Sequence, residues 1–422
     1  MDLKNKKIAI MGLGYVGLPL AIEFSKKFEV VGYDIDKVKI REIEKIYTQK
    51  KLSKKKLKIT SDDSFLNQID IFIVTVPTPI NKDKTPDLKP LKKASKLIGE
   101  KLKKGDVVIY ESTVYPGLTD EISIPILEKK SKLKINEDFL VGYSPERVSP
   151  GDKNDFTKIN KIVSGSNLYA TNLVYKIYKT IIKAKLFKTN SIKVAEASKI
   201  IENVQRDVNI SFMNEVSLIL SKLNINTQEV LEAAQTKWNF LNFTPGLVGG
   251  HCISVDPYYL TFKAKKHNYK PKVILSGRLI NNNMGIYVAN VILKKIKKNF
   301  YKKKDKIKIG LFGLTFKENT NDLRDSKVFD IIKVLNKKKN IDLFAIDPFL
   351  KNKDIKNKFK IKLNKKIKKL DVFILAVPHT QFLKFNYHKL KKILRNQSSI
   401  VIDIKGILKD KKIKENFDYW SL

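Results

Sequence analysis

Residues 6–24, KKIAIMGLGYVGLPLAIEF, decide the fold of the N-terminal part of the chain. Lys7–Met11 has the composition of a short buried strand, and an apolar segment of helical composition closes the stretch. Between them lie Gly12, Gly14 and Gly17, spaced as G-x-G-x-x-G. The first glycine permits a tight turn, the second lets phosphates approach the backbone, and the third lets the helix pack on the sheet. The stretch therefore predicts a dinucleotide-binding turn.

The next apolar run, VVGYDID (residues 30–36), carries an acidic residue, Asp34, at the end of the expected strand. A carboxylate in this place accepts hydrogen bonds from the adenosine ribose hydroxyls and repels the 2′-phosphate of NADP. The cofactor predicted from these residues is NAD. The alternative is an ordinary glycine turn in an α/β protein.

The first 150 residues alternate short apolar strands with lysine-rich amphipathic helices. Further strands are expected at Val30–Tyr33, Ile71–Val76, Val107–Glu111 and Phe139–Tyr143. This alternation predicts βαβ units and a parallel sheet. Residues Ser191–Leu223 have apolar positions at helical spacing without proline or glycine, so we expect one long helix there, and a second helix over Gly277–Phe300.

The strand–helix alternation resumes at Lys306 and repeats the N-terminal pattern. IAIMGLG (8–14) resembles IGLFGLT (309–315), and DIFIVTVP (70–77) resembles DVFILAVP (371–378). In both copies 58 residues separate the first glycine from the aspartate. The expected fold class is therefore α/β, with two Rossmann-like doubly wound parallel sheets joined by a long central helix and a helical middle domain. Thr315 and Glu318 replace the second and third glycines, so we do not expect the second copy to bind a dinucleotide in the same way.

The charge of the chain raises a different class of function. Lys and Arg number 84 against 43 Asp and Glu, a net charge of +41, which would suit nucleic acid or an anionic membrane. Only six of the 84 are arginines, the residue on which nucleic-acid recognition usually depends. The lysines spread along the chain, with denser runs at 50–58, 294–308 and 351–369. We therefore expect no nucleic-acid partner.

Neither a metal site nor a membrane segment is expected. The single cysteine, Cys252, excludes an internal disulfide framework and a zinc site built on several cysteines. Basic residues before Ile8–Ile22 imitate a signal peptide, but glycines interrupt this stretch and no cleavage site follows. No uninterrupted apolar segment reaches the roughly 18 residues of a membrane span. The expected location is cytoplasmic.

Cys252 lies in TPGLVGGHCISVDPYY (residues 244–259), a loop rich in glycine and proline. A thiolate nucleophile needs access and nearby donors or cations, which His251 could supply. A free cysteine is more often a small buried hydrophobe. Asp256 lies four residues further on.

Polar residues elsewhere could complete a site. Lys199 and Asn203 share one face of the long helix and could direct two donors at an oxyanion, although helical lysines usually face solvent. Glu146 and Arg147 in YSPERVSPG, and Thr113 in YESTVYPG, follow strands at the edge where open α/β sheets bind ligands. The alternative for each of these residues is a capping or turn role.

Taken together, these residues resemble one family, the UDP-glucose/GDP-mannose dehydrogenases, over essentially the whole chain. The motifs that carry the resemblance are IMGLGYVGLPLA, TVPTP, ESTVYPG, SPERVSPGD, ASKIIENVQRDVNI, PGLVGGHCISVDPYYL, GRLINNNM and GLTFKENTNDLRDSKV. The amino-acid sequences of three of these motifs are similar to those of the family branch that acts on UDP-N-acetylhexosamines in capsule and O-antigen synthesis. The resemblance implies an oxidoreductase that uses two NAD and one water to oxidise the C6 alcohol of UDP-N-acetylglucosamine or UDP-N-acetylgalactosamine to the acid. UDP-glucose and UDP-N-acetylmannosamine remain alternative substrates, and an inactive polyanion-binding protein remains a distant alternative.

The same resemblance implies roles for individual residues. Cys252 forms a thiohemiacetal and then a thioester, Lys199 and Asn203 hold the oxyanion, Asp256 and Thr113 position water or accept protons, and Glu146 assists thioester hydrolysis. The implied cofactor contacts are Gly12, Gly14, Tyr15, Val16, Gly17, Asp34, Lys39, Pro77, Thr78, Ser112, Thr113 and Arg324. The implied substrate contacts are Glu146, Arg147, Lys199, Asn203, Gly249, Gly250, Lys317 and Lys405, with Arg147 our candidate for sensing the N-acetyl group.

The family's domain order implies three domains and a homodimer. Residues 1–188 would bind NAD, 189–300 would form the helical dimerisation domain with the cysteine loop, and 301–422 would bind the UDP-sugar. Two departures from the family pattern bear on the substrate. Thr244 replaces an arginine of related N-acetylhexosamine enzymes, which puts one substrate contact in question, and Val255 replaces a lysine of the UDP-glucose members, which argues against UDP-glucose.

Overall fold

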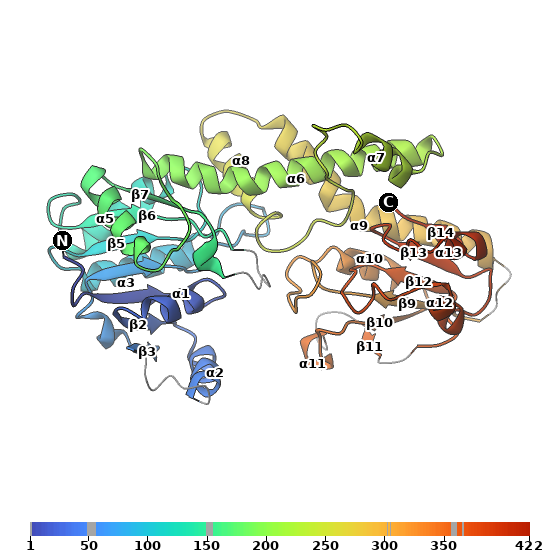
Figure 1. Ribbon diagram of the computed structural model, residues 1–422, viewed down its shortest axis with the longest axis horizontal. Coiled ribbons are helices and arrows are strands. Elements are labelled where there is room, and N and C mark those ends of the chain that lie inside the picture. Colours follow the sequence, from blue (N-terminus) through green and yellow to red (C-terminus); the bar gives the residue numbers. More distant parts are fainter. Residues whose placement is uncertain are drawn as a thin grey trace. The chain divides into compact units, whose positions relative to one another are not determined.

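The structure, a computed structural model, describes residues 2–48, 56–148, 155–301, 303, 305–355, 361–364 and 367–422. The chain forms two compact units (Figure 1). Unit 1 comprises Met1–Asn203 and Tyr258–Lys270, and unit 2 comprises Val204–Pro257 and Pro271–Leu422. Parts of the lysine runs 50–58, 294–308 and 351–369, and the end of the SPERVSPGD motif, lie outside the described residues. The three domain boundaries expected from the sequence stay a prediction.

Unit 1 is built on a sheet that has eight strands among the described residues, in the order β3-β2-β1-β4-β5-β6-β7-β8. The strands are β1 (Lys7–Met11), β2 (Glu29–Tyr33), β3 (Leu57–Thr60), β4 (Ile71–Val74), β5 (Val107–Tyr110), β6 (Leu140–Tyr143), β7 (Lys161–Gly165) and β8 (Leu186–Lys188). Neighbouring strands run parallel except β6 and β7. The order of the first six is that of a dinucleotide-binding fold.

Helices cover both faces of this sheet, which is why its central strands are apolar throughout. They are α1 (Gly17–Phe24), α2 (Lys37–Thr48), α3 (Lys89–Lys101), α4 (Ile124–Ser131) and α5 (Leu168–Lys179). Ile8 and Ile10 of β1 belong to a core that also holds Phe24 of α1 and Tyr178 of α5. A hydrogen bond of 2.8 Å between the hydroxyls of Tyr110 and Ser95 joins β5 to α3.

The middle of the chain, residues 192–300, is described throughout and is largely helical. It contains α6 (Ile192–Lys222), α7 (Thr227–Ala234), α8 (Asp256–Lys266) and α9 (Lys272–Phe300). The predicted long helix matches α6 to within one residue at each end. The second predicted helix was placed too late, because α9 begins directly after Pro271 and not at Gly277. Proline lacks an N–H and fixes its own backbone angle, so it suits the start of a helix.

Unit 2 repeats the strand order of a dinucleotide-binding fold. Its sheet has the order β11-β10-β9-β12-β13-β14 among the described residues, and all its neighbouring strands are parallel. The strands are β9 (Ile307–Phe312), β10 (Ile341–Ile346), β11 (Lys362–Leu363), β12 (Val372–Leu375), β13 (Ile400–Asp403) and β14 (Asp418–Trp420). The helices are α10 (Val328–Leu335), α11 (Asn352–Ile355), α12 (Tyr387–Ile393) and α13 (Lys411–Asn416). The two Rossmann-like sheets expected from the sequence are confirmed.

The internal repeat extends to individual hydrogen bonds. Leu13 N–H donates to Asp34 Oδ2 (2.8 Å), and Leu314 N–H donates to Asp347 Oδ2 (2.7 Å) at the matching place. The two copies then differ, because Asp347 lies 3.1 Å from Nε2 of His379 and both side chains are buried. The acid of each copy thus has a side-chain partner of a different kind, Lys39 for Asp34 and His379 for Asp347.

Two predicted strands end earlier than expected. β4 ends at Val74 and not Val76, and β5 ends at Tyr110 and not Glu111. The hydroxyl of Thr75 donates to the carbonyl of Gly12 (2.7 Å), and that of Ser112 donates to the carbonyl of Val76 (2.7 Å). These residues therefore leave the sheet to form its carboxyl edge.

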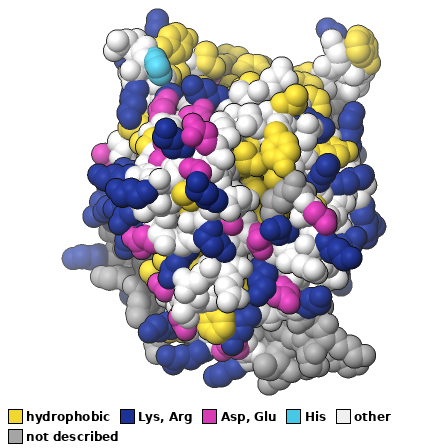
Figure 2. Space-filling view, turned by 90° about the vertical axis from the view of Figure 1, so that its left-hand side faces the viewer, with side chains coloured by type: hydrophobic (Ala, Val, Ile, Leu, Met, Phe, Trp, Pro, Cys, Tyr) yellow, Lys and Arg dark blue, Asp and Glu magenta, His cyan; other side chains and the backbone are white. Residues whose placement is uncertain are grey.

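The charged side chains on one face of the molecule can be followed in Figure 2. On the face drawn in Figure 2, Lys and Arg side chains are scattered and interspersed with acidic ones. Within the described part of the chain, no helix is long and apolar enough to cross a membrane.

Candidate active site

The glycine turn of unit 1 has the geometry that a dinucleotide requires. Gly12 has φ +102°, which favours glycine, and a Cβ at Gly17 would lie only 1.9 Å from the carbonyl oxygen of Gly12. A Cβ at Gly14 would meet nothing within 4 Å, so the backbone there faces open space. The turn lies where β1 separates β2 from β4, the point at which the strand order reverses and α/β folds bind ligands. These residues fit a pyrophosphate.

The acid after β2 is held rigidly beside this turn. Asp34 accepts hydrogen bonds from the Leu13 N–H (2.8 Å), from the Asp36 N–H (3.0 Å) and from Nζ of Lys39 (2.5 Å). Burial acts to raise the pKa of Asp34, but the hydrogen bonds outweigh it and hold the pKa below its ordinary value. Asp34 is therefore an ionised acceptor at neutral pH. Tyr15 and Val16 lie within the turn itself.

Other predicted cofactor residues lie in the loops that follow β4 and β5. Thr78 and Ser112 are buried, Thr113 is half-buried and Pro77 is exposed. The hydroxyl of Tyr143 donates to the carbonyl of Ser112 (3.2 Å), which ties the end of β6 to the loop after β5. The loops after neighbouring parallel strands thus meet at one edge of the sheet.

Three further predicted residues of unit 1, Glu146, Lys199 and Asn203, are all buried. Burial raises the pKa of Glu146, and the positive charge of Lys199 opposes that rise. The predicted lysine of α6 is therefore a buried cation facing a carboxyl group, not a solvated surface residue. Arg147 is engaged separately, since Nη2 lies 2.6 Å from Glu202 Oε1 and Nη1 donates to the carbonyl of Asn160 (3.0 Å).

The cysteine loop lies in unit 2. Cys252 is half-buried, and its carbonyl accepts from the N–H groups of Val255 (3.0 Å) and of Asp256 (2.8 Å), the first residue of α8. Asp256 itself is 4% exposed. Burial, followed by the charge of Arg324, lowers the pKa of His251, while Asp322 opposes this. The neutral imidazole is therefore favoured near pH 7, so this shift does not favour His251 as a cation beside Cys252.

Two glycines shape this loop through contacts within unit 2. A Cβ at Gly249 would lie 2.4 Å from the carbonyl oxygen of Asp325. Gly250 has φ +96°, and a Cβ there would lie 2.7 Å from the ring of Phe316. Both contacts come from the segment GLTFKENTNDLRDSKV, so this segment supports the backbone next to Cys252.

The basic residues predicted in the last third of the chain follow strands of the second sheet. Lys317 comes after β9 and Lys405 after β13, so both lie at the carboxyl edge. Lys405 pairs with Glu318, and its Cε would lie 3.9 Å from a Cβ at Gly246. The guanidinium of Arg324 binds both carboxylate oxygens of Asp322, with Nε at 3.0 Å from each.

Comparison with known proteins identifies the family. Residues 6–182 match the NAD-binding domain of the UDP-glucose/GDP-mannose dehydrogenase family, residues 193–283 match its central domain, and residues 310–410 match its UDP-binding domain. The chain belongs to this family. It is accordingly an oxidoreductase whose cofactor is NAD.

Its relatives align with it from end to end. The chain is 47% identical to a UDP-N-acetyl-D-glucosamine 6-dehydrogenase of Pseudomonas aeruginosa, over 97% of this chain and 99% of that protein. It is 45% identical to a UDP-N-acetyl-D-glucosamine 6-dehydrogenase of Salmonella typhi, over 98% and 96%. Among solved structures, the UDP-D-ManNAc dehydrogenase of Pyrococcus horikoshii superposes with a TM-score of 0.85 at 30% identity, covering 98% of each chain.

A buried charge network near Glu146 was not predicted from the sequence. Nζ of Lys161 lies 2.9 Å from Glu111 Oε2 and donates to the carbonyls of Ser144 (3.3 Å) and Pro145 (3.2 Å). The hydroxyl of Tyr178 also donates to Glu111. Lys161 thus fixes the backbone just before Glu146. Its partner is 50 residues away in sequence, so only the fold reveals the pair.

A second buried acid, Glu196, was also not predicted. It lies on α6 and accepts from the Gly117 N–H (2.5 Å), from the Thr119 N–H (3.0 Å) and from the Thr119 hydroxyl (2.7 Å). Gly117 ends the ESTVYPG motif, and Thr119 begins a π-helical turn, Thr119–Ser123. Glu196 therefore anchors the loop after β5 to the helix that carries Lys199.

Replacing Glu196 with glutamine should flatten the pH dependence of stability. Burial raises the pKa of Glu196 to about 7, although hydrogen bonds from Thr119 and Gly117 oppose the rise. The folded state thus keeps a proton that the unfolded chain loses above about pH 4.3. The free energy of unfolding should fall as pH rises from there to about 7, by up to about 1.4 kcal/mol per pH unit. Urea unfolding at several pH values measures this, with Glu121→Gln as the control; an unchanged slope in Glu196→Gln would refute the assignment.

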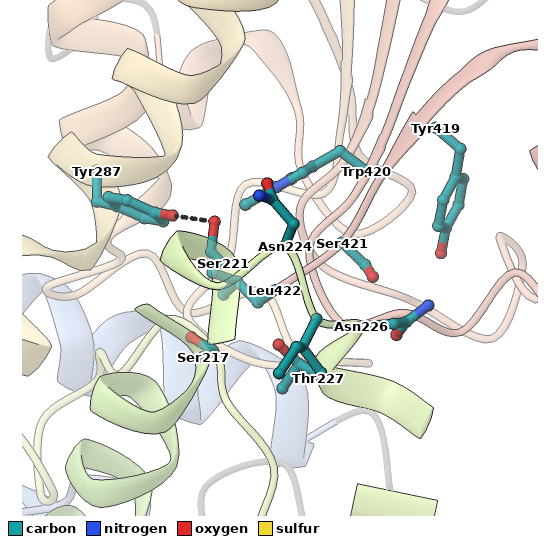
Figure 3. Close-up of a pocket in the computed structure, with 11 residues that line it drawn as sticks. Ser217, Ser221, Asn224, Asn226, Thr227, Tyr287, Tyr419, Trp420, Ser421 and Leu422 are labelled. Atoms are coloured by element: carbon teal, nitrogen blue, oxygen red, sulfur yellow. Dashed lines mark hydrogen bonds between the residues drawn. The ribbon is translucent and has the colours of Figure 1, made fainter. Parts of the chain in front are cut away.

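A pocket of about 300 Å³ in unit 2 lies at the end of α6 (Figure 3). It is lined by Ser217, Ser221, Asn224, Ile225, Asn226, Thr227, Tyr287, Tyr419, Trp420, Ser421 and Leu422. The hydroxyls of Tyr287 and Ser221 lie 3.3 Å apart at its edge (Figure 3). None of the residues predicted from the sequence to bind substrate or cofactor lines it, so we do not include it in the candidate active site.

Proposed function

We propose that the protein oxidises the C6 hydroxyl of UDP-N-acetylglucosamine to the carboxylate in an NAD-dependent, four-electron reaction. The observation that carries this proposal is the 47% and 45% identity, over almost the full length, to two enzymes named for that sugar. The match to a UDP-D-ManNAc dehydrogenase is weaker, at 30% identity. UDP-N-acetylgalactosamine differs from the proposed substrate only in the orientation of the C4 hydroxyl and is the second candidate.

The four-electron oxidation of one UDP-sugar requires one thiol, two NAD and one water. NAD, when bound, supplies the hydride acceptor, and the complete oxidation consumes two NAD. Loss of a C6 hydride and of the hydroxyl proton first converts the alcohol into the aldehyde. The Cys252 thiolate adds to the C6 aldehyde, forming a C–S bond while the carbonyl oxygen takes a proton. Loss of the C6 hydride and of the hydroxyl proton then converts this thiohemiacetal into a thioester. Water attacks the thioester, the C–S bond breaks, and the products are the carboxylate, the free thiol and a proton.

The remaining roles follow from the residues of each unit. In unit 1, Gly12, Gly14 and Gly17 receive the cofactor pyrophosphate, and Asp34 accepts from its ribose hydroxyls. The buried Lys199 and Asn203 supply donors for an oxyanion. Burial raises the pKa of Glu146, which brings the carboxyl group closer to the operating pH and suits an acid or base in thioester hydrolysis. In unit 2, Lys317 and Lys405 supply positive charge for the UDP diphosphate.

Comparing kcat/KM across four substrates tests the specificity. The panel is UDP-N-acetylglucosamine, UDP-N-acetylgalactosamine, UDP-N-acetylmannosamine and UDP-glucose, followed by NADH absorbance. We expect the first to exceed UDP-glucose by at least about tenfold, a difference of about 1.4 kcal/mol in transition-state binding. A preference for UDP-glucose or UDP-N-acetylmannosamine would overturn the substrate assignment. In that event the four-electron chemistry would still stand.

The product is a nucleotide-linked uronic acid, a precursor suited to the biosynthesis of acidic polysaccharide such as capsule or O-antigen. Both proposed substrates, NAD and a UDP-sugar, are cytoplasmic metabolites, so we place the enzyme in the cytoplasm. No further partner is required for the reaction.

We also propose that the protein acts as a homodimer through α6 and α9. Large apolar side chains that the protomer leaves exposed recur at seven-residue spacing on both helices: Val194 and Ile201, Phe212 and Ile219, and Leu279 and Ile286. Seven residues are nearly two helical turns, so each pair lies on one face of its helix. A second copy of the chain would remove these side chains from water, which supports a helix-to-helix interface.

Charging this face should separate the protomers. Phe212 and Ile219 are 57% and 53% exposed, so aspartate at both positions is compatible with the protomer fold. In a homodimer, the two new aspartates of each protomer would be buried without partners, and we expect the dissociation constant to rise by at least about a hundredfold. Sedimentation equilibrium of Phe212→Asp/Ile219→Asp measures this, with Leu383→Asp as the control because Leu383 is similarly exposed, at 57%, outside both helices. A double variant that remains dimeric would exclude this face.

A further inference from the structure

Polar residues are buried in the contact between α6 and α9 of unit 2. A Cβ at Gly277 would lie 2.6 Å from Oγ of Ser211, so the two helices approach closely. The buried polar side chains are Asp207 and Asn214 on α6 and Arg278 and Asn281 on α9, each at most 2% exposed. Three of them belong to the motifs ASKIIENVQRDVNI and GRLINNNM, yet none contributes to the chemistry assigned above.

These side chains form a directed chain of hydrogen bonds that begins at Asp207. Arg278 Nη1 donates to Asp207 Oδ1 (2.6 Å), and Asn281 Nδ2 donates to the same oxygen (2.7 Å) and to the Asp207 carbonyl (3.0 Å). Asn214 Nδ2 in turn donates to Asn281 Oδ1 (2.8 Å). The Asp207 carbonyl only accepts, and Asp207 Oδ1 already accepts from Arg278, so these two oxygens fix which end of the Asn281 amide faces Asp207, and hence which end Asn281 presents to Asn214.

The chain ends on the backbone of the cysteine loop. The Gly246 N–H donates to Asn214 Oδ1 (2.8 Å), and Asn214 Nδ2 donates to the Gly246 carbonyl (3.1 Å). One buried amide therefore satisfies both backbone groups of Gly246, as a neighbouring strand would. Buried backbone groups without partners are costly, so this pairing holds the loop at that residue.

Gly246 lies six residues before Cys252, and the residues between them have little freedom. Val248 is buried, and Gly249 and Gly250 pack against the backbone of Asp325 and the ring of Phe316. Displacement of Gly246 would therefore be transmitted to the cysteine, because the intervening chain is short and packed.

We infer that Asn214 is a positioning residue for Cys252, and that Asn281 and Asp207 hold the Asn214 amide in the orientation that binds Gly246. The inference rests on the proposed nucleophilic role of Cys252 for its kinetic consequence. The hydrogen bonds themselves do not depend on that role. Failure of one claim is thus distinguishable from failure of the other.

Hydrogen–deuterium exchange at Gly246 tests the contact directly. In the wild-type protein we expect the Gly246 amide to exchange at least about a hundredfold more slowly than an unprotected amide, because the amide hydrogen is buried and hydrogen-bonded. Exchange at the unprotected rate would overturn the inference without any variant being made. In Asn214→Ala and in Asn281→Ala, exchange of the peptide that contains Gly246 should accelerate at least about tenfold.

Kinetics then separate positioning from general destabilisation. Asn214→Ala should lower kcat at least about tenfold while the affinity for NAD, whose predicted pyrophosphate and ribose contacts lie in unit 1, stays within about twofold. The matched control is Asn416→Ala, because Asn416 is a half-exposed residue of unit 2 whose side-chain amide donates to the Lys412 carbonyl four residues earlier (2.9 Å). In Asn416→Ala, the exchange rate of the peptide that contains Gly246 and the kcat should both remain at wild-type values. If exchange accelerates in Asn214→Ala but kcat does not fall, Asn214 does not position Cys252. If exchange is unchanged in Asn214→Ala, Asn214 does not hold Gly246 and has no positioning role.

Discussion

Replacing Cys252 with alanine is expected to abolish formation of the uronic acid. Without the thiol no thiohemiacetal forms, so the second oxidation cannot proceed through a thioester. The loss should be on the order of 10³-fold or more in the rate of acid production, as for removal of other covalent nucleophiles. NAD binding should persist, because the predicted NAD residues of the glycine turn and Asp34 lie in unit 1 while Cys252 lies in unit 2.

Chromatographic detection of the uronic acid measures this effect, and NAD binding to Cys252→Ala serves as the control for folding. Cys252 is the only cysteine in the chain, so alkylation of the wild-type protein by iodoacetamide offers an independent check on the same atom. Acid production by Cys252→Ala within about tenfold of the wild-type rate would contradict the nucleophilic role.

Gly17→Ala should lower mainly the stability of the fold, whereas Gly14→Ala should lower mainly the affinity for NAD. At Gly17 the new Cβ would lie 1.9 Å from the Gly12 carbonyl oxygen and 2.4 Å from Oγ1 of Thr75, so the turn itself must move. We expect a loss of about 3 kcal/mol or more in the free energy of unfolding, at the upper end for an overpacked site because the obstacle is backbone. At Gly14 the new Cβ meets nothing within 4 Å, so stability should change by less than about 1 kcal/mol.

The affinity for NAD should fall in Gly14→Ala, since the space that the methyl group fills is where phosphates approach the backbone. Urea unfolding and titration with NAD of the two purified variants measure both quantities. Wild-type NAD affinity in a stable Gly14→Ala would show that the pyrophosphate binds elsewhere. Wild-type stability in Gly17→Ala would show that the turn is not packed as described.

Local patterns made most of the fold predictable. Gly12 and Gly313 mark the first turn of each sheet, and the shared spacing to Asp70 and Asp371 indicated two copies before any strand order was known. Strand ends were less predictable. Thr75 is β-branched and suits a strand, but its hydroxyl bonds the Gly12 carbonyl and the chain leaves the sheet there.

The candidate site was predictable only for residues that lie in motifs. In the sequence, Lys199 cannot be told apart from the many surface lysines. It is buried near Glu146, which lies 53 residues earlier in the chain. The pairs Lys161–Glu111 and Asp207–Arg278 are separated by 50 and 71 residues. Buried polar pairs of this kind have no local signature, because each needs the whole fold to bring its partner close. The net charge of +41 also indicated little about function, because most of the positive charge comes from lysines that are spread along the whole chain.

The number of NADH molecules formed per UDP-sugar tests the central claim most directly. Limiting UDP-N-acetylglucosamine is incubated to completion with excess NAD and the purified protein, and NADH absorbance is compared with the amount of sugar supplied. A four-electron oxidation through Cys252 predicts two NADH and one uronic acid per sugar. One NADH per sugar, with an aldehyde as the product, would contradict the mechanism, and no NADH with any of the four UDP-sugars would contradict the proposed function.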